Sequence, residues 1–394
     1  MRRASLLLLM FLTLLPGCDP AQQRSRPKAL FIGLDGVQLE RYLLLGDATH
    51  LRQRLYYGKA YAGGVNGRGS EQPTLSGPGW VTLLTGVWSN KHGVTSNDES
   101  LRVDRAFPSL FRRLRMAMPN AYLASVVNWS PLNTAFMLED AHGADVRESG
   151  LSDEQVIERT LQILGNTPAD FTFIQLDEPD QAGHDRGFGD RYQRALRKVD
   201  NQIGQLLDKV DERRRRYPQE DWLVMVSTDH GRDYWGKGHG GLSEQEKTIF
   251  IASNKPLNQE FTQPGIPAEN PGPNHLYSLP AQTSVAPTLL RHMGLKLQPD
   301  WLLDGTPLLG NTGVRKARAD ESKGQLRWNS NASGHLSILK NGHVVAQVPA
   351  AGGQWRDPEG MKQQNDYVLV LDGTPAAVRN RPEPKAVVIE ESGY

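Results

Sequence analysis

The residues best suited to chemistry in this chain are aspartates and histidines that follow short apolar runs. Three such segments are Asp35-Gly36, Asp177-Glu178-Pro179-Asp180 followed by Gly183-His184, and Thr228-Asp229-His230-Gly231. One aspartate after a strand is commonplace as a turn residue, but turns do not explain three, two of them with a histidine nearby. Asp and His together ligate Zn, Mn or Fe, and imidazole argues against a purely Mg or Ca site. His239, in the glycine-rich segment 236–241, adds another imidazole.

Ser76 is the candidate nucleophile. It lies in the segment Pro73-Thr74-Leu75-Ser76-Gly77-Pro78-Gly79-Trp80, where Pro78 suits the first turn of a helix that Gly86 would close. We therefore expect Ser76 just ahead of a helix N-terminus, where partial positive charge favours an anion. One interpretation is that a serine at this position serves simply as the N-cap of the helix. Beside two metal ions, its hydroxyl could instead ionise and attack an ester.

The elements that must position these residues are typical of a parallel α/β sheet. Short β-rich runs alternate with helical patterns, which favours βαβ units. The expected strands are residues 29–34, 122–127, 171–176, 223–227 and 248–252, and the expected helices are 107–118, 152–164, 190–216 and 283–293. Ser152 and Gln155 are spaced as a capping box. Because ligand sites in open α/β sheets lie outside the carboxyl ends of the strands, we expect the aspartates to converge.

The composition changes after residue 310. Residues 311–323 are polar and charged, which favours a linker, and alternating runs with an Asn341-Gly342 turn follow it. The predicted organisation is a catalytic domain over 28–310, the linker, and a small β-rich domain over 324–394. The β-rich domain could pack against the catalytic body or bind carbohydrate or another envelope component.

Charge and composition exclude several classes of protein. The chain has 394 residues, 45 basic and 44 acidic, for a formal net charge of +1. Nucleic-acid-coating proteins are usually strongly basic, so we expect no nucleic-acid-binding surface. The one cysteine excludes an intrachain disulfide and a zinc site built from cysteines. No apolar run after the first 17 residues is long enough to span a bilayer.

The amino-terminal residues are typical of a secretory signal. Met1-Arg2-Arg3 is basic, residues 4–15 are apolar, and Cys18 follows Pro16-Gly17. This layout resembles a bacterial lipoprotein signal, in which residues 1–18 form the signal, Cys18 receives the lipid and 19–27 act as a tether. A plain signal peptide is the alternative. Either way, we expect an extracytoplasmic protein, and the lipoprotein interpretation implies an envelope protein whose membrane leaflet stays open.

The motifs together resemble the type I phosphodiesterase/nucleotide pyrophosphatase family of the alkaline phosphatase superfamily. They are, in order, Asp-Gly, Pro-Thr-x-Ser-x-Pro, Thr-Gly with Lys91-His92-Gly93, Glu-Pro-Asp-x-x-Gly-His, Asp-His-Gly and Gly-His-Gly. The resemblance implies an alkaline phosphatase-like α/β fold and two zinc ions, or Mn or Fe in one site. One ion would be held by Asp35, Ser76, Asp229 and His230, and the other by Asp180, His184 and His239.

The segment around Ser76 also departs from this family. Gly79 stands where the family has an asparagine that contacts a phosphoryl oxygen, so another donor must serve. Our candidate substrate contacts are Gly77, through its backbone N–H, Asn97 and Asn128, with Trp80 as an aromatic wall for a leaving group. The arginines that sulfatases and alkaline phosphatases carry beside the nucleophile are missing, which favours a singly charged diester.

We therefore expect a lipid-anchored two-metal phosphodiesterase with a phosphoseryl intermediate. Its substrate would be a phosphate diester that is a small molecule or is borne by a lipid or glycan. The alternatives are a phosphoethanolamine or phosphoglycerol transferase, a hydrolase of phosphonate, sulfate or phosphomonoester, and a metal-binding envelope protein without turnover.

Overall fold

A seven-stranded sheet forms the centre of the protein, which we describe from a computed structural model over residues 25–380, except 167–168, 264, 266–269 and 331. The strand order is β2-β7-β6-β1-β5-β3-β4. Its strands are β1 (Arg26–Leu34), β2 (Tyr56–Tyr61), β3 (Leu123–Val127), β4 (Val146–Glu148), β5 (Phe171–Leu176), β6 (Glu220–Thr228) and β7 (Thr248–Ser253). The pairs among β6, β1, β5, β3 and β4 are parallel, whereas β7 pairs antiparallel with both β6 and β2. The expected α/β fold with a mostly parallel sheet is confirmed.

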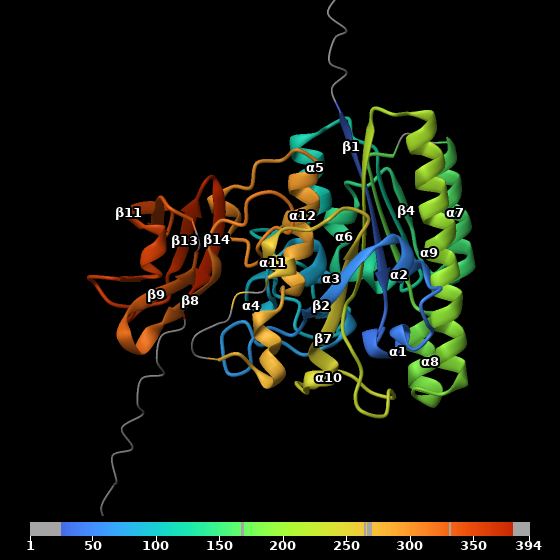
Figure 1. Ribbon diagram of the computed structural model, residues 1–394, viewed down its shortest axis with the longest axis horizontal. Helices are drawn as coiled ribbons and strands as arrows, with labels where there is room; N and C mark the ends of the chain where they lie inside the picture. Colours follow the sequence, from blue (N-terminus) through green and yellow to red (C-terminus); the bar gives the residue numbers. More distant parts are fainter. Residues whose placement is uncertain (1–24, 167–168, 264, 266–269, 331, 381–394) are drawn as a thin grey trace, which may run out of the picture.

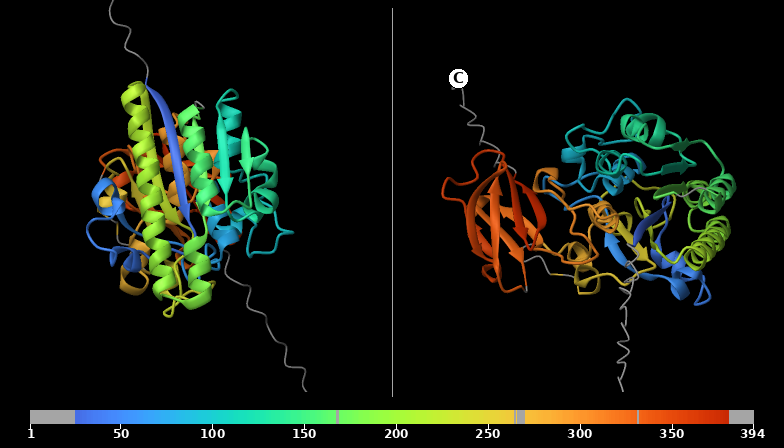
Figure 2. Two further views of the ribbon diagram at one scale, coloured as in Figure 1. Left: turned by 90° about the vertical axis from the view of Figure 1, so that its right-hand side faces the viewer. Right: turned by 90° about the horizontal axis from the view of Figure 1, so that it is seen from above.

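Helices cover both faces of this sheet (Figures 1 and 2). They are α1 (Leu39–Leu43), α2 (His50–Arg54), α3 (Ser76–Thr85), α4 (Ser89–His92), α5 (Leu110–Ala117), α6 (Leu138–Ala141), α7 (Asp153–Asn166), α8 (Glu178–Arg186), α9 (Asp190–Arg216), α10 (Glu244–Lys247), α11 (Gln259–Thr262) and α12 (Val285–His292). Short 3₁₀ or π turns are Leu132–Phe136, Pro273–Ser278, Gln282–Ser284, Pro299–Trp301, Glu321–Lys323 and Ala350–Gly352.

Alternation along β1 explains the two layers. Ala29 and Phe31 pack into one apolar core with helices α3, α5 and α12, while Leu30 and Ile32 pack into the other with α7 and α9. Successive side chains of a strand point to opposite faces, so an uninterrupted apolar run is what a strand buried on both faces requires.

The helix predictions are confirmed to within a few residues. Helix α9 spans the predicted range, and the capping box of α7 is present, because Ser152 N donates to Gln155 Oε1 at 2.9 Å and Gln155 N to Ser152 Oγ at 3.4 Å. The edge strands β2 and β4 were not predicted. Strand β2 is half exposed and β4 has only three residues, so neither shows an apolar run.

The carboxyl-terminal β region consists of two small sheets around their own apolar core. Its strands are β8 (Arg315–Asp320), β9 (Gln325–Asn329), β10 (His335–Lys340), β11 (His343–Pro349), β12 (Gln354–Arg356), β13 (Asp366–Leu371) and β14 (Thr374–Arg379). The Asn341-Gly342 hairpin joins β10 to β11 as expected. The linker prediction is wrong for residues 315–320, which form β8, because pairing with β9 compensates their polar sequence.

This β region packs against the body that carries the large sheet. Arg291 Nη2 donates to Thr374 Oγ1 at 2.8 Å, and Ala377 N donates to Leu303 O at 3.2 Å. No helix in the described ranges is long and apolar enough to cross a bilayer. Cys18, the predicted signal over 1–18 and most of the predicted tether lie outside the described residues.

Candidate metal centre and nucleophile

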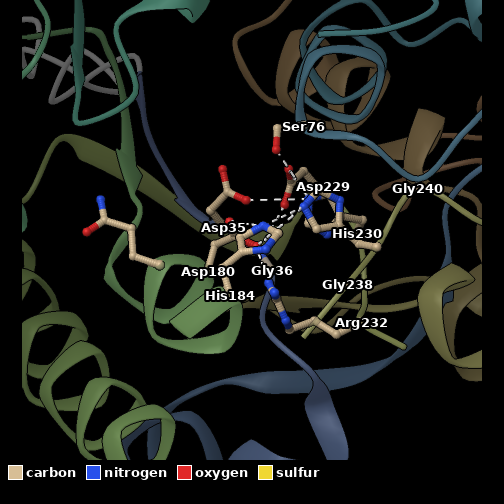
Figure 3. A network of polar contacts seen from close by, with 12 residues as sticks. Asp35, Gly36, Ser76, Asp180, His184, Asp229, His230, Arg232, Gly238 and Gly240 are labelled. Atoms are coloured by element: carbon tan, nitrogen blue, oxygen red, sulfur yellow. Dashed lines mark hydrogen bonds and ion pairs between the residues drawn. The ribbon is translucent and has the colours of Figure 1, made fainter. Parts of the chain in front are cut away.

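Three adjacent strands deliver the predicted aspartates to one edge of the sheet (Figure 3). Asp35 follows β1, Asp229 follows β6, and Asp180 lies in the first turn of α8, directly after β5. Asp35 is 1% exposed and Asp229 is fully buried. The expected convergence at the carboxyl ends of the strands is therefore what the structure has.

His230 Nε2 lies at the centre of the first group. It is 3.2 Å from Asp229 Oδ2, 3.5 Å from Asp35 Oδ1 and 3.3 Å from Ser76 Oγ. With metal–ligand bonds of about 2.0–2.1 Å, two ligands of a tetrahedral zinc ion lie about 3.3 Å apart. The spacing of these four side chains fits one such ion.

The two carboxylates of this group are incompletely paired. Asp35 Oδ2 accepts hydrogen bonds from Trp80 Nε1 at 3.0 Å and Gln175 Nε2 at 3.1 Å, and Asp229 Oδ1 accepts from Gly36 N at 3.2 Å. Asp35 Oδ1 and Asp229 Oδ2 are buried without a hydrogen-bond partner.

Burial raises the pKa of both Asp35 and Asp229 well above the usual range, and repulsion from neighbouring carboxylates adds to it, Asp229 acting on Asp35 and Asp180 on Asp229. Buried charges in proteins are paired or coordinate a metal. The two unpartnered oxygens point toward His230 Nε2, so a cation among them would satisfy both. The residues present therefore fit a metal ion.

The second group joins Asp180, His184 and His239. His184 Nε2 lies 3.2 Å from Asp180 Oδ2 and 3.0 Å from His239 Nε2, and His239 Nε2 is 3.9 Å from Asp180 Oδ1. Ligand atoms of Asp180 and His239 lie within 4.8 Å of one another and of His230, whereas His184 faces the other oxygen of Asp180 and lies at the edge of this set. His230 belongs to both groups by distance, because its ring stacks on that of His239 with centroids 3.8 Å apart. The side chain of His184 is 50% exposed and forms the open side of the centre.

Backbone carbonyls orient two of the imidazoles for ligation. His230 Nδ1 lies 2.9 Å from Gly231 O, and His239 Nδ1 lies 2.9 Å from Thr74 O. A carbonyl only accepts, so Nδ1 carries the proton in each ring and Nε2 keeps its lone pair for a metal. Burial lowers the pKa of both His230 and His239, which keeps the rings neutral.

At the exposed end of the second group, the pKa values of His184 and Asp180 are shifted in opposite directions. The hydrogen bond with Asp180 raises the pKa of His184. Burial alone would raise the pKa of Asp180, but the hydrogen bond from His184 and the charge of Arg232 outweigh it and hold this pKa well below the usual range. Asp180 is thus ionised and available as a ligand.

Ser76 is the first residue of α3, and Leu75 is its N-cap. The serine therefore lies inside the helix by one residue, and the N-cap interpretation is wrong. The close approach of Gly79 explains why this helix reaches the centre, since a Cβ there would lie 2.7 Å from Asp229 O. The helix N-terminus thus faces the carboxylate group and contributes its partial positive charge.

The four candidate substrate contacts lie in different environments. Asn97 is exposed beside the nucleophile, and its Oδ1 accepts the Gly77 N–H at 2.7 Å, so that N–H already has a partner. Trp80 does not form an aromatic wall for a leaving group, because its side chain is fully buried and its Nε1 donates to Asp35 Oδ2. Asn128 donates to Asp153 Oδ1 at 2.9 Å in the loop network behind α8.

Sequence reasoning missed two buried side chains that support the centre. Gln175 lies within β5 and bonds Asp35, and Arg232 follows the Asp-His-Gly motif and pairs with Asp180. A glutamine inside an otherwise apolar strand was a usable signal, since buried polar groups need a partner. The histidine of the Lys91-His92-Gly93 segment has a structural role, because its Nε2 lies 3.0 Å from Thr82 Oγ1 and its Nδ1 accepts from Val94 N at 3.1 Å.

Comparison with known proteins agrees with these motifs. Residues 105–234, less than half of the chain, match the family described as type I phosphodiesterase / nucleotide pyrophosphatase. This segment contains Asp180, His184, Asp229 and His230 but not Asp35, Ser76 or His239. No curated protein matches the chain in sequence.

Solved structures show the same fold at low identity. The phosphonate monoester hydrolase of Agrobacterium radiobacter is 13% identical, with 89% of each chain covered and a TM-score of 0.50. A Bacteroides thetaiotaomicron protein of glycosaminoglycan metabolism is 13% identical, with 88% of this chain and 85% of that chain covered and a TM-score of 0.52.

Murine ectonucleotide pyrophosphatase / phosphodiesterase 5 is 18% identical, with a TM-score of 0.39. The alignment covers 52% of this chain and spans 57% of the murine chain. Residues 105–234 are thus similar to the type I phosphodiesterase/nucleotide pyrophosphatase family, and the chain has an alkaline phosphatase-like fold.

Proposed function

We propose that this protein is a metal-dependent hydrolase of phosphate diesters in which Ser76 is the nucleophile. One observation carries the proposal. The Ser76 hydroxyl lies 3.3 Å from His230 Nε2, among two buried carboxylate oxygens that have no partner, and a second Asp/His group adjoins it. A hydroxyl beside two cation sites is an arrangement suited to in-line displacement at phosphorus.

In this proposal the two groups of ligands would hold metal ions with different roles. Two zinc ions, or Mn or Fe in one site, would stabilise negative charge on the serine oxygen and on the leaving oxygen. Ser76 gives its proton to solvent and Oγ attacks phosphorus. The bond to the leaving oxygen breaks, that oxygen takes up a proton and departs as the alcohol, and a phosphoseryl ester remains. Water then attacks this ester on the side of the departed alcohol and restores the serine. Helix α3 holds Oγ in place throughout.

Within the described residues, the guanidinium that contacts the centre is already occupied, which supports a diester as substrate. Arg232 is the guanidinium that adjoins the centre, and it is buried and bonded to Asp180. It is thus not available to a terminal phosphate with two negative charges. A diester carries one charge and needs less compensation from the protein.

Asn97 is our choice for the missing side-chain donor. Its Oδ1 is occupied by Gly77 N, which fixes the amide directly beside Ser76. The amide nitrogen at the other end of this group can donate to a phosphoryl oxygen. An Asn97→Asp substitution keeps the size of the side chain but replaces this donor by an acceptor, and it should lower kcat/KM about 10- to 100-fold.

Location forms a further part of the proposal, in which Cys18 carries a lipid and the enzyme acts in the cell envelope. Strand β1 begins at Arg26 and ends at Leu34, next to Asp35. At about 3.3 Å per residue, the first described residues lie about 26 Å from the centre, at the opposite end of the sheet. A protein tethered there would present its site away from the membrane, to a small-molecule or glycan-borne diester more readily than to a headgroup of the same bilayer.

A paired hydrolysis assay tests the proposed activity. Zinc-loaded protein lacking residues 1–18 is given bis-p-nitrophenyl phosphate, p-nitrophenyl phosphate and p-nitrophenyl sulfate, beside Ser76→Ala and a chelated sample. We expect diester preference that both controls lose. Preference for the monoester or the sulfate would contradict the diester assignment. No turnover by protein with two bound zinc ions would contradict a hydrolase, and turnover only with an added acceptor alcohol would indicate a transferase.

A further inference from the structure

Arg232 is a buried arginine for which the proposed chemistry has no use. Its side chain is fully buried, and each guanidinium nitrogen has a partner. Nη1 pairs with Asp180 Oδ1, Nε donates to Gly236 O at 2.6 Å, and Nη2 donates to Lys237 O at 3.1 Å. Taking a guanidinium out of water is costly unless its geometry is fully satisfied. Because every nitrogen of the Arg232 guanidinium has a partner, we look for a structural role of this side chain.

The fold makes room for this side chain with two glycines. A Cβ on Gly183 would lie 2.5 Å from Arg232 Cζ, and a Cβ on Gly36 would lie 2.7 Å from Nη1. Gly36 also has φ +58°, a conformation that other residues rarely adopt. The guanidinium thus lies in a preformed cradle between the end of β1 and helix α8.

The contacts of Arg232 reach all of the second group of ligands. Its bond to Asp180 Oδ1 leaves Oδ2 facing His184 Nε2 at 3.2 Å. Its bonds to Gly236 and Lys237 fix the loop that presents His239 two residues later.

The first group has other supports. Trp80 and Gln175 hold Asp35, and the Gly36 N–H holds Asp229. We propose that Arg232 is a positioning residue for the second metal site alone. It selects which oxygen of Asp180 faces the ion, and it holds the loop that carries His239 in place beside Asp180. This inference rests on the two-metal part of the proposed function.

Two opposing effects make the inference testable. The positive charge of Arg232 repels a cation at the second site, whereas its positioning of Asp180 and His239 favours binding. Arg232→Lys keeps the charge but cannot bond three oxygens in this planar arrangement. Arg232→Met removes both charge and bonds. If positioning dominates, both variants bind the second ion more weakly. If charge dominates, the lysine variant resembles the wild type and the methionine variant binds more tightly.

The measurement is Zn²⁺ binding by the full chain, followed as zinc per protein at controlled free zinc. We expect the wild type to bind two ions. Both variants should keep the first ion with unchanged affinity and lose 10- to 100-fold in affinity for the second, the usual effect of removing a residue that orients a ligand.

The matched control is Arg213→Met, which removes a second buried arginine, paired with Glu220 at the far end of the sheet. It should destabilise the protein but leave both zinc affinities unchanged. Unchanged or tighter binding of the second ion in Arg232→Met would overturn the inference, as would an equal loss of both ions in the two Arg232 variants. Failure of the wild type to bind a second ion would instead contradict the proposed two-metal function.

Discussion

Both ends of the central sheet carry buried carboxylates, but they differ in how completely these carboxylates are paired. At the amino ends of the strands, Glu220 accepts from Arg213 Nε at 2.9 Å and from Trp222 Nε1 at 2.8 Å, and Lys28 pairs with Asp170 at 2.9 Å. At the carboxyl ends, Asp35 and Asp229 each leave one buried oxygen without a partner.

The pKa values differ accordingly. Burial alone would raise the pKa of Glu220, but the bonds from Arg213 and Trp222 outweigh it and lower this pKa. The pKa of Asp35 and that of Asp229 are raised, because nothing in the chain outweighs their burial. A buried carboxylate with complete partners stabilises the fold, whereas one left incomplete indicates a site that awaits a cation.

The largest effect should come from the hydroxyl at the carboxyl end. We expect Ser76→Ala to lower kcat/KM toward the diester by at least about 1,000-fold, roughly 4 kcal/mol, because the attacking atom is lost. The matched control is Ser89→Ala, since Ser89 is also a buried serine at the first position of a helix. Initial rates at equal zinc content check this. Equal losses in the two variants would contradict the nucleophile assignment.

Breaking the complete pair at the other end should cost stability rather than activity. We expect Glu220→Gln to lower the free energy of unfolding by about 3 kcal/mol, because it leaves the Arg213 guanidinium buried without its counter-charge. Urea unfolding measures the loss, and kcat per folded molecule should not change. A stable variant with reduced kcat would mean that the two ends are not independent.

A third buried site, around His92, should respond to pH. Burial lowers the pKa of His92 to about 3, below its ordinary value of 6.5, so the folded state binds this proton more weakly than the unfolded state. Its contribution to stability is therefore full above pH 6.5 and is lost as the pH falls toward 3.

Between pH 7 and pH 5 we expect this loss to reach about 2 kcal/mol. His92→Gln should remove that part of the pH dependence, as measured by urea unfolding in chelator at both pH values. The same slope in the variant would assign the acid sensitivity to other groups.

The smallest expected effect is a change in the stability of the metal-free protein when Asp229, one of the two carboxylates with an unpartnered oxygen, is replaced. Asp229→Asn keeps an oxygen for the Gly36 N–H and places an amide donor where the unpartnered oxygen was, next to His230 Nε2 and Asp35 Oδ1. The chelated variant should gain at least about 1 kcal/mol of stability at pH 7, because a buried charge is removed.

The same variant should lose zinc from the first site and with it the activity. Thermal unfolding with chelator and zinc analysis without it provide the two readouts. A less stable chelated variant would show that Asp229 already has an adequate partner within the chain.

Much of the fold was predictable because its signals are local. Strands β1, β5 and β6 are apolar runs that are buried on both faces, and α9 has helical periodicity over its whole length. Strand β2 was missed because an edge strand is half exposed, and β8 because its polar residues are compensated by pairing with β9. Strand β7 pairs antiparallel with both β6 and β2, a direction that is not visible in its own residues.

The sequence by itself determined which chemical groups lie at the ends of β1, β5 and β6, because Asp35 and Asp229 directly follow their strands, Asp180 lies in the first turn of the helix after β5, and parallel strands end at one edge. Only the tertiary structure decided what each group can do. Trp80 and Gln175 are 45 and 140 residues from Asp35, yet they occupy one of its oxygens and leave the other open. Arg232 fixes Asp180 from 52 residues away. Whether a buried carboxylate is complete depends on partners that only packing brings within hydrogen-bond distance, and no spacing along the chain encodes that.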